Sequence, residues 1–309
     1  MWYINPIENE YFICMQILLI SFAKAMKIDY QMMFAESWSF CYNTNAVSIG
    51  SAIEPGYRDC RYKNLRHFHG ISCIEQSEMN LDELRSLCDQ YLSIGPVILA
   101  IDTYDCPWSE SYQKYHINHH CLIVDIGKDS FICIDPYLTN QQKKLNFDSL
   151  AIWRNKAYTL SIVESQAKQV DYFNELKSCI DYIDSSNYFQ SLTIFKEKLL
   201  SLDSLQEEIK NYPDYFAAPL FYSLRHIANH RKCFSDFLDY LGTYIPSDNY
   251  SESSVMFRKL GFLYDTLWMQ LMKQCMLKTF RKEKVLEKID EILESEYSVY
   301  KKLSMQVRS

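Results

Sequence analysis

The sequence predicts an α+β protein whose C-terminal part is all-helical. The first observation is an apolar run at residues 11–27, which has the length and composition of a buried helix. The second is a set of short apolar strands separated by turn residues, at 97–102, 121–126 and 131–135. The third is a change after about Ser165, where strand patterns stop and helical patterns continue to the end. We therefore expect two domains, at 1–165 and 166–309.

The composition is that of a globular protein with a sizeable core, because 48% of the 309 residues are hydrophobic. The formal net charge is -7. Phosphate binding needs a basic surface, so this charge argues against nucleic acid as a partner. The 11 cysteines are odd in number and lack the C-x-x-C spacing of zinc or redox motifs, which favours a reducing cytoplasm.

The sequence predicts neither an export signal nor a membrane span. The apolar run from Phe12 to Phe22 follows Glu8 and Glu10, whereas a signal peptide carries Lys or Arg at that place. The first basic residue is Lys24, which lies after the run. No apolar run reaches the roughly 18 residues that a membrane-spanning helix needs.

The predicted N-terminal helix gives one cysteine a special position. Asn9 is a suitable N-cap and Glu10 in the first turn suits the helix dipole, so Cys14 lies near the helix start. Backbone N–H groups that point at a thiol favour the thiolate, so Cys14 is the cysteine with a sequence reason to be reactive. The alternative is that Cys14 is one more apolar residue of a buried helix.

The next part of the chain is predicted to contain turns, a helix and strands. Residues 29–42 are typical of a second helix or of a turn-rich segment with aromatics. Residues 81–91 have an amphipathic helical pattern with Asn80 as the N-cap. Residues 97–102 form a continuous apolar strand, suited to a sheet covered on both faces. A last strand is expected at 157–163.

The strands at 121–126 and 131–135 are joined by a Gly-Lys-Asp-Ser segment, which is typical of a hairpin turn. His120 opens the first strand and Asp135 closes the second. Antiparallel pairing brings them to the same end of the sheet, where the acid can hold the imidazole. We prefer His120 to its neighbour His119 because it stands at the strand start.

The remainder of the chain is predicted to be helical. Helices are expected at roughly 168–185, 188–210, 215–242, 252–280 and 282–303. His226 and His230 lie four residues apart, which is a metal-ligand spacing, but no neighbouring acid or cysteine completes a ligand motif. We therefore expect no metal.

Cys14, His120 and Asp135 together supply the residue types of cysteine-dependent acyl transfer. The thiolate attacks a carbonyl carbon, the imidazolium protonates the leaving group, and the acid orients the imidazole. A cysteine on an N-terminal helix, followed by His and Asp on successive strands, is the order of papain-like enzymes. We therefore expect residues 1–165 to have a papain-like cysteine protease fold, with the N-terminal helix packed on an antiparallel sheet.

Several short motifs extend this similarity to a known family. They are Cys14 in the opening helix, Phe34–Tyr42, Gly95-Pro96-Val97, Asp102 with Tyr104 and Pro107, His120–Val124, and Asp135-Pro136. In these motifs, residues 10–165 resemble the N-terminal domain of butirosin biosynthesis protein H and its relatives, which is akin to the bacteriocin-processing double-glycine peptidases. The helical half, through Leu224-Arg225 and Phe234–Leu238, is similar to that family's companion domain. The resemblance extends to the cysteine-protease-like amide synthase of closthioamide biosynthesis.

The resemblance implies an acyltransferase of natural-product biosynthesis. Family members move an acyl group from a phosphopantetheinyl carrier-protein thioester to an amine. The implied partners are thus an acyl or peptidyl carrier protein and a small amine or diamine, with no other cofactor and in the cytoplasm. We assign Asp102, Tyr104 and Asn9 to substrate binding, since the carboxylate of Asp102 would attract a cationic amine.

The sequence departs from the family at two places. The Gly-rich stretch before the aromatic is here Ala35–Ser39, which alters a pocket wall. Six residues before the cysteine, where the peptidases carry an oxyanion-stabilising Gln, this chain has Glu8, whose carboxylate repels an oxyanion. Asn5, Asn9 or the backbone N–H of Cys14 would have to serve instead.

A thioester needs less electrophilic help than an amide, so the missing Gln favours acyl transfer over peptide hydrolysis. Two other interpretations stay open. One is a cysteine protease or amidase, in which water resolves the acyl-enzyme. The other is a non-catalytic binding module on the same fold, with Cys14 as a core residue.

Overall fold

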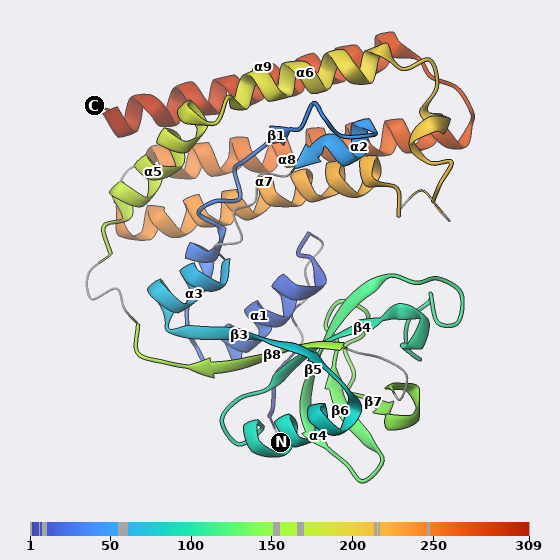
Figure 1. Cartoon of the computed structure of the whole chain (residues 1–309). Coiled ribbons are helices and arrows are strands. Elements are labelled where there is room, and N and C mark those ends of the chain that lie inside the picture. The colour runs from blue at the N-terminus through green and yellow to red at the C-terminus, as the bar shows by residue number, and fades with distance from the viewer. Residues whose placement is uncertain are drawn as a thin grey trace. The chain divides into compact units, whose positions relative to one another are not determined.

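The two parts of the chain form two compact units. A computed structural model describes residues 2–5, 7, 11–54, 61–150, 155–165, 170–212, 215, 217–245 and 248–308. One unit consists of Met1–Met33 and Arg61–Lys168, and the other of Phe34–Cys60 and Gln169–Ser309. The first unit is α+β and the second is mainly helical (Figure 1). The α+β class with a helical C-terminal region is confirmed.

The first unit is built on a six-stranded antiparallel sheet. In sheet order the strands are β3 (Ile71–Met79), β8 (Asn155–Ile162), β4 (Val97–Asp102), β5 (Asn118–Ile126), β6 (Ser130–Ile134) and β7 (Lys143–Asn146). The four strands expected from the sequence correspond to β8, β4, β5 and β6. The sequence analysis missed β3 and β7, the two edge strands of the sheet, which carry many polar side chains.

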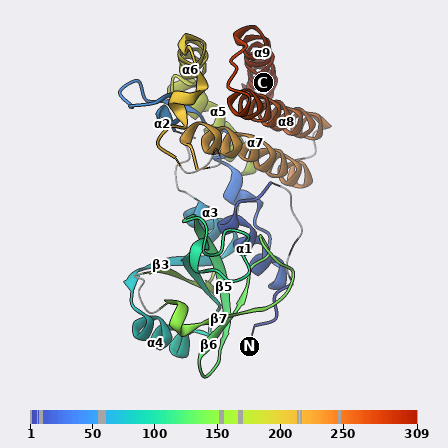
Figure 2. The same ribbon diagram turned by 90° about the vertical axis from the view of Figure 1, so that its right-hand side faces the viewer.

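Helices α1 (Cys14–Ala25) and α4 (Leu81–Tyr91) lie on opposite sides of this sheet (Figures 1 and 2). As predicted, Asn80 caps α4, and its side chain accepts a hydrogen bond from the N–H of Glu83 (3.0 Å). The other helical segments of the unit are α3 (Arg61–His69) and two short 3-10 helices, η2 (Thr103–Asp105) and η3 (Phe147–Leu150). A third 3-10 helix, η1 (Gln31–Phe34), spans the point where the chain passes into the second unit. Residues 29–42 are therefore the turn-rich alternative and not a second long helix.

The strands β4 and β5 present alternate residues to the two faces of the sheet. Leu99 and Cys121 are paired, and both belong to the buried cluster that includes Cys88 of α4. The intervening pair, Ile98 and Leu122, is equally buried on the face toward α1. This strand pair is covered on both sides, which explains its continuous apolar sequence.

The second unit consists of helices that run beside one another, together with a short hairpin (Figures 1 and 2). Its elements are β1 (Cys41–Tyr42), α2 (Ile49–Ala52), β2 (Ile53–Glu54), α5 (Tyr172–Ser185), α6 (Tyr188–Ser201), η4 (Leu205–Glu208), α7 (Pro219–Tyr244), α8 (Asp248–Met276) and α9 (Lys282–Arg308). The five predicted helices are present, and α6 is shorter than expected. No described helix has both the length and the apolar character that crossing a membrane requires.

The division of the chain differs from the predicted continuous domains 1–165 and 166–309. The segment Phe34–Cys60 belongs to the helical unit. Trp38 and Phe40 from this segment are fully buried, and both rings contact Tyr188 of α6. These aromatic residues fill the helical core, and for this reason the segment leaves the sheet-containing unit.

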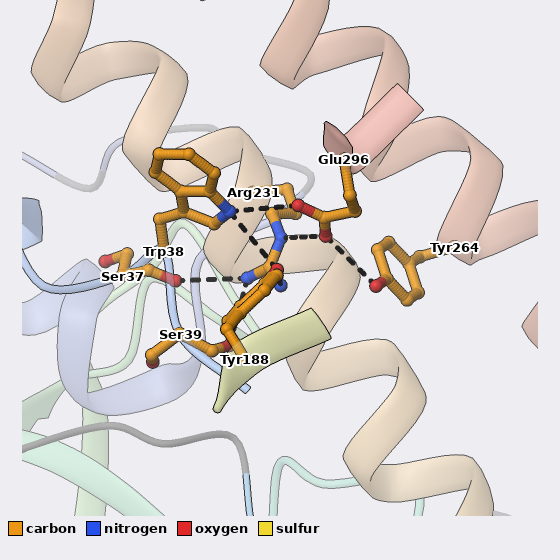
Figure 3. A network of polar contacts seen from close by, with 7 residues as sticks. All are labelled: Ser37, Trp38, Ser39, Tyr188, Arg231, Tyr264 and Glu296. Atoms are coloured by element: carbon orange, nitrogen blue, oxygen red, sulfur yellow. Dashed lines mark hydrogen bonds and ion pairs between the residues drawn. The ribbon is translucent and has the colours of Figure 1, made fainter. Parts of the chain in front are cut away.

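A buried polar network ties residues 37–39 to the helices of the second unit (Figure 3). The carboxylate of Glu296 on α9 accepts hydrogen bonds from Nε of Arg231 on α7 (2.8 Å) and from Nε1 of Trp38 (2.9 Å). It also accepts one from the hydroxyl of Tyr264 on α8 (3.0 Å). Both charged side chains are fully buried, so their mutual pairing offsets a large desolvation cost.

The guanidinium of Arg231 uses its remaining donors on the irregular segment at 37–39 and on Tyr188. Nη1 donates to the backbone carbonyls of Ser37 (3.3 Å) and Ser39 (3.2 Å), and Nη2 donates to the hydroxyl of Tyr188 (2.5 Å). These bonds satisfy buried backbone carbonyls that belong to no helix or sheet. The arginine thus holds an irregular segment in place inside a helical core.

Replacing Arg231 by Met should lower the free energy of unfolding by about 3–5 kcal/mol, because Glu296 is then left buried and unpaired. Urea unfolding followed by circular dichroism measures this loss. The matched control is K210M, which removes the exposed Lys210–Glu207 pair and should change stability by at most about 0.5 kcal/mol. Equal effects of the two variants would contradict the structural role of the network.

Candidate active site

Cys14 is the first residue of α1. The helix starts later than predicted, because its N-cap is Ile13, whose N–H donates to Oε1 of Gln16 in the first turn (3.1 Å). Asn9 is therefore not the cap. Asn9 lies outside the described residues, as does Glu8, so the substrate-binding role of Asn9 and the effect of Glu8 on an oxyanion stay predictions. A thiol at the first position of a helix lies where the helix dipole favours the thiolate.

The hairpin of β5 and β6 contains a one-residue bulge that changes which side chains share a face. Next to the turn, Ile126 is opposite Phe131, but beyond the bulge Leu122 is opposite Ile134. Without the bulge, Asp135 would be opposite Leu122, and its side chain would share a face of the sheet with His120. The bulge shifts the pairing by one residue, so the side chain of Asp135 lies on the opposite face, which is the face of His119.

The carboxylate of Asp135 consequently meets His119. Its Oδ2 accepts hydrogen bonds from Nε2 of His119 (2.8 Å) and from Nε1 of Trp108 (2.7 Å). Its Oδ1 accepts one from the backbone N–H of Leu138 (3.3 Å), and the residue is fully buried. The histidine that Asp135 holds is thus His119, and not His120 as the sequence analysis expected.

The thiol of Cys14 is in reach of both imidazoles. Its Sγ lies 3.4 Å from Nδ1 of His120. Burial raises the pKa of the thiol, but hydrogen bonding to His119 and then to His120, together with the electrostatic interaction with these rings, outweighs burial and lowers the pKa to about 6. At neutral pH the thiolate is therefore the major form.

The pKa of His119 is shifted in the opposite direction to that of Cys14. Burial lowers its pKa, but the hydrogen bond to Asp135 and then the interaction with Cys14 outweigh this and raise the pKa to about 9. Between about pH 6 and pH 9, Cys14 and His119 form a thiolate–imidazolium pair. A nucleophile next to an acid held by a third group is the arrangement that nucleophilic catalysis requires.

The sequence analysis missed His119 and Trp108 as members of this site. For His119 the available signal was its place beside the preferred histidine, but the bulge that selects it has no local sequence mark. For Trp108 the signal was weaker still, since the residue lies in the loop after β4 and reaches Asp135 only through the tertiary fold.

The two other predicted substrate residues lie together at the end of β4. Oδ2 of Asp102 is 2.9 Å from Nδ1 of His116, and Oδ1 accepts hydrogen bonds from the backbone N–H groups of Tyr104 (2.8 Å) and Ile117 (3.2 Å). The ring of Tyr104 stacks on His116, with ring centroids 4.4 Å apart. Asp102 pairs with Asn118 in the β4–β5 ladder, two residues along from the pair that includes His120. These contacts make Asp102 an organiser of the loop that borders His119 and His120.

The remaining candidate ligands and thiols form no further site among the described residues. The rings of His226 and His230 on α7 are 5.7 Å apart, and no described group of three or more His, Cys, Asp or Glu has a metal-binding arrangement. All ten described cysteines are free thiols. Comparison with protein-family models and with curated proteins finds no match for this chain.

Alkylation of Cys14 by iodoacetamide should follow a titration with a midpoint near pH 6, because the thiolate is the reacting form. The rate is measured across pH by mass spectrometry of the Cys14 peptide. H119Q should raise the midpoint more than H120Q does, since His119 lowers the thiol's pKa more strongly. A wild-type midpoint near 9, the ordinary value of a thiol, would contradict the ion pair.

Proposed function

We propose that this protein is a cysteine-dependent acyltransferase with a papain-like catalytic unit. It takes an acyl group from a carrier-protein thioester onto Cys14 and passes it to an amine, which gives an amide. The observation that carries the proposal is a helix-start thiol in contact with two imidazoles, one of which is held by a buried carboxylate. The antiparallel sheet with helix α1 on one side supports the papain-like assignment.

The chemistry follows from the protonation states of the pair. The thiolate of Cys14 attacks the thioester carbonyl carbon, and the imidazolium of His119 gives its proton to the departing thiol. Asp135 keeps the ring of His119 oriented and stabilises its positive charge. The thioester bond breaks as the bond between the acyl carbon and Sγ forms.

Acyl transfer is favoured over hydrolysis of an amide by the chemistry of the residues near the thiol. The sequence carries Glu8 where related peptidases carry a Gln for the oxyanion. A thioester carbonyl is attacked with less oxyanion stabilisation than an amide carbonyl requires. Asp102 and His116 add a polar loop beside the histidines, where a small amine can be received.

The donor would be a phosphopantetheinyl carrier protein in a pathway that makes a natural product, as the family resemblance implies. No other cofactor enters the proposed reaction. The ten described free thiols fit a reducing compartment such as the cytoplasm, where carrier-dependent assembly takes place.

Incubation with the benzoyl thioester of pantetheine should add one benzoyl group to the protein, and C14A should remain unmodified. Intact-mass spectrometry and mapping of the modified peptide measure this. Addition of butylamine should then release the amide and restore the unmodified mass. Release of benzoic acid alone, at any amine concentration, would instead identify a hydrolase, and no adduct at all would favour a binding module.

The rate of acylation should rise as pH increases through about 6, when Cys14 loses its proton. It should fall as pH increases through about 9, when His119 loses the proton that the leaving group needs. The measurement is the single-turnover rate of thiol release as a function of pH. A rate that keeps rising beyond pH 9 would mean that no imidazolium takes part.

Asp135→Asn should lower the acylation rate by roughly 10² to 10⁴-fold, because His119 loses the carboxylate that orients it and holds its proton. The same single-turnover assay applies. The control is D129N, a change at the exposed turn of the same hairpin, which should leave the rate unchanged. Equal rates for D135N and the wild type would remove Asp135 from the mechanism.

A further inference from the structure

Transfer of an acyl group to an alkylamine raises a question of proton balance that one histidine cannot answer. An alkylamine near neutral pH is an ammonium ion, as the lysine side chain is. It must lose one proton before it can attack and a second one as the amide forms. Cys14 leaves as a thiolate and takes neither proton, so two acceptors are needed.

His119 can accept only one of these protons. After acylation it has given its proton to the departing thiol and is neutral. Its Nε2 is committed to Asp135, and its other nitrogen is the one available toward Cys14. It therefore accepts one proton from the attacking nitrogen and returns to the imidazolium form, which leaves the first proton of the ammonium ion without an acceptor.

His120 is placed to be the second acceptor. Its Nδ1 is 3.4 Å from Sγ of Cys14, so its ring is beside the atom that carries the acyl group. Its Nε2 has no hydrogen-bond partner among the residues that the structure describes, and its ring is half-buried against Tyr158 (ring centroids 6.1 Å apart). With Nδ1–H directed at the sulfur, the lone pair of the neutral ring is at Nε2.

The residue opposite His120 in the sheet is small, and a carboxylate lies on the same face. Its partner across the β4–β5 ladder is Ala100, whose side chain is a single methyl group. Asp102 lies two residues beyond Ala100 and therefore on the same face of the sheet. A carboxylate at this place attracts an ammonium ion toward His120.

We infer that His120 is a second catalytic base, whose Nε2 removes the first proton from an acceptor that arrives as an ammonium ion. This inference rests on the proposed function and divides the two protons between adjacent histidines on opposite faces of β5. His120 serves the acceptor and His119 serves the thiol. In this mechanism the acceptor is an alkylamine or diamine that arrives as its ammonium ion.

The steps balance in atoms and charge. His120 takes a proton from the ammonium ion, and the neutral amine nitrogen attacks the acyl carbon on Cys14. The bond from that carbon to Sγ breaks, its electron pair returns to sulfur, and His119 takes the second proton from nitrogen. His120 then releases its proton to water, so that thioester plus ammonium ion gives amide, free thiol and one proton.

The test compares two acceptors on the same preformed benzoyl-Cys14 enzyme. Butylamine is an ammonium ion at pH 7, whereas hydroxylamine is neutral and needs to lose only one proton. In H120Q, which keeps an N–H donor near the sulfur, butylamine transfer should fall about 100-fold or more relative to hydroxylamine transfer. H120N is measured in parallel. Because both rates come from one preparation, partial unfolding leaves their ratio unchanged.

The outcomes separate this inference from the proposed function. If benzoyl-Cys14 forms and the butylamine-to-hydroxylamine ratio in both variants equals that of the wild type, the role of His120 is overturned while the acyltransferase stands. If the wild type forms no benzoyl-Cys14, both are overturned. A selective loss of butylamine transfer supports the inference, and H119Q provides the contrast, since it should slow acylation itself.

Discussion

A buried carboxylate sets the geometry of the candidate site. Asp135 is inaccessible to water, and its oxygens accept hydrogen bonds from His119, Trp108 and the backbone of Leu138. A charge at such a place is stable only while its donors stay in position. Strand β5, the loop after β4 and the turn after β6 are therefore fixed relative to one another. Asp135 raises the pKa of His119 and so keeps its ring protonated. The protonated ring in turn lowers the pKa of Cys14 and favours its thiolate.

The bulge in β5 converts an ordinary hairpin into a site with two different imidazoles. Side chains of neighbouring residues in a strand point to opposite faces, so His119 and His120 have unlike surroundings. One is buried and bound to an acid, and the other is half-buried with one nitrogen toward the sulfur. Bulges redirect side chains in this way near functional sites. The proposed transfer to an ammonium ion would use two such imidazoles of different character beside one thiol.

The second unit depends on a comparable buried charge. Arg231 and Glu296 come from helices that are distant in sequence, and they close around the irregular segment at 37–39. The segment lies in the helical core because Trp38 fills space between the helices and donates to Glu296. The chain thus leaves its first unit, builds part of the second and then returns to the first.

The sequence by itself determined the α+β class, the helical second half, the apolar hairpin, and the presence of a cysteine at a helix start near histidines and an acid. Each of these follows from local periodicity, capping or turn chemistry. The tertiary structure decided that His119 holds Asp135, that Trp108 completes the site, and that residues 34–60 join the helices. The physical reason is that a one-residue bulge and the partners of a buried charge depend on contacts between distant segments, which no local pattern records.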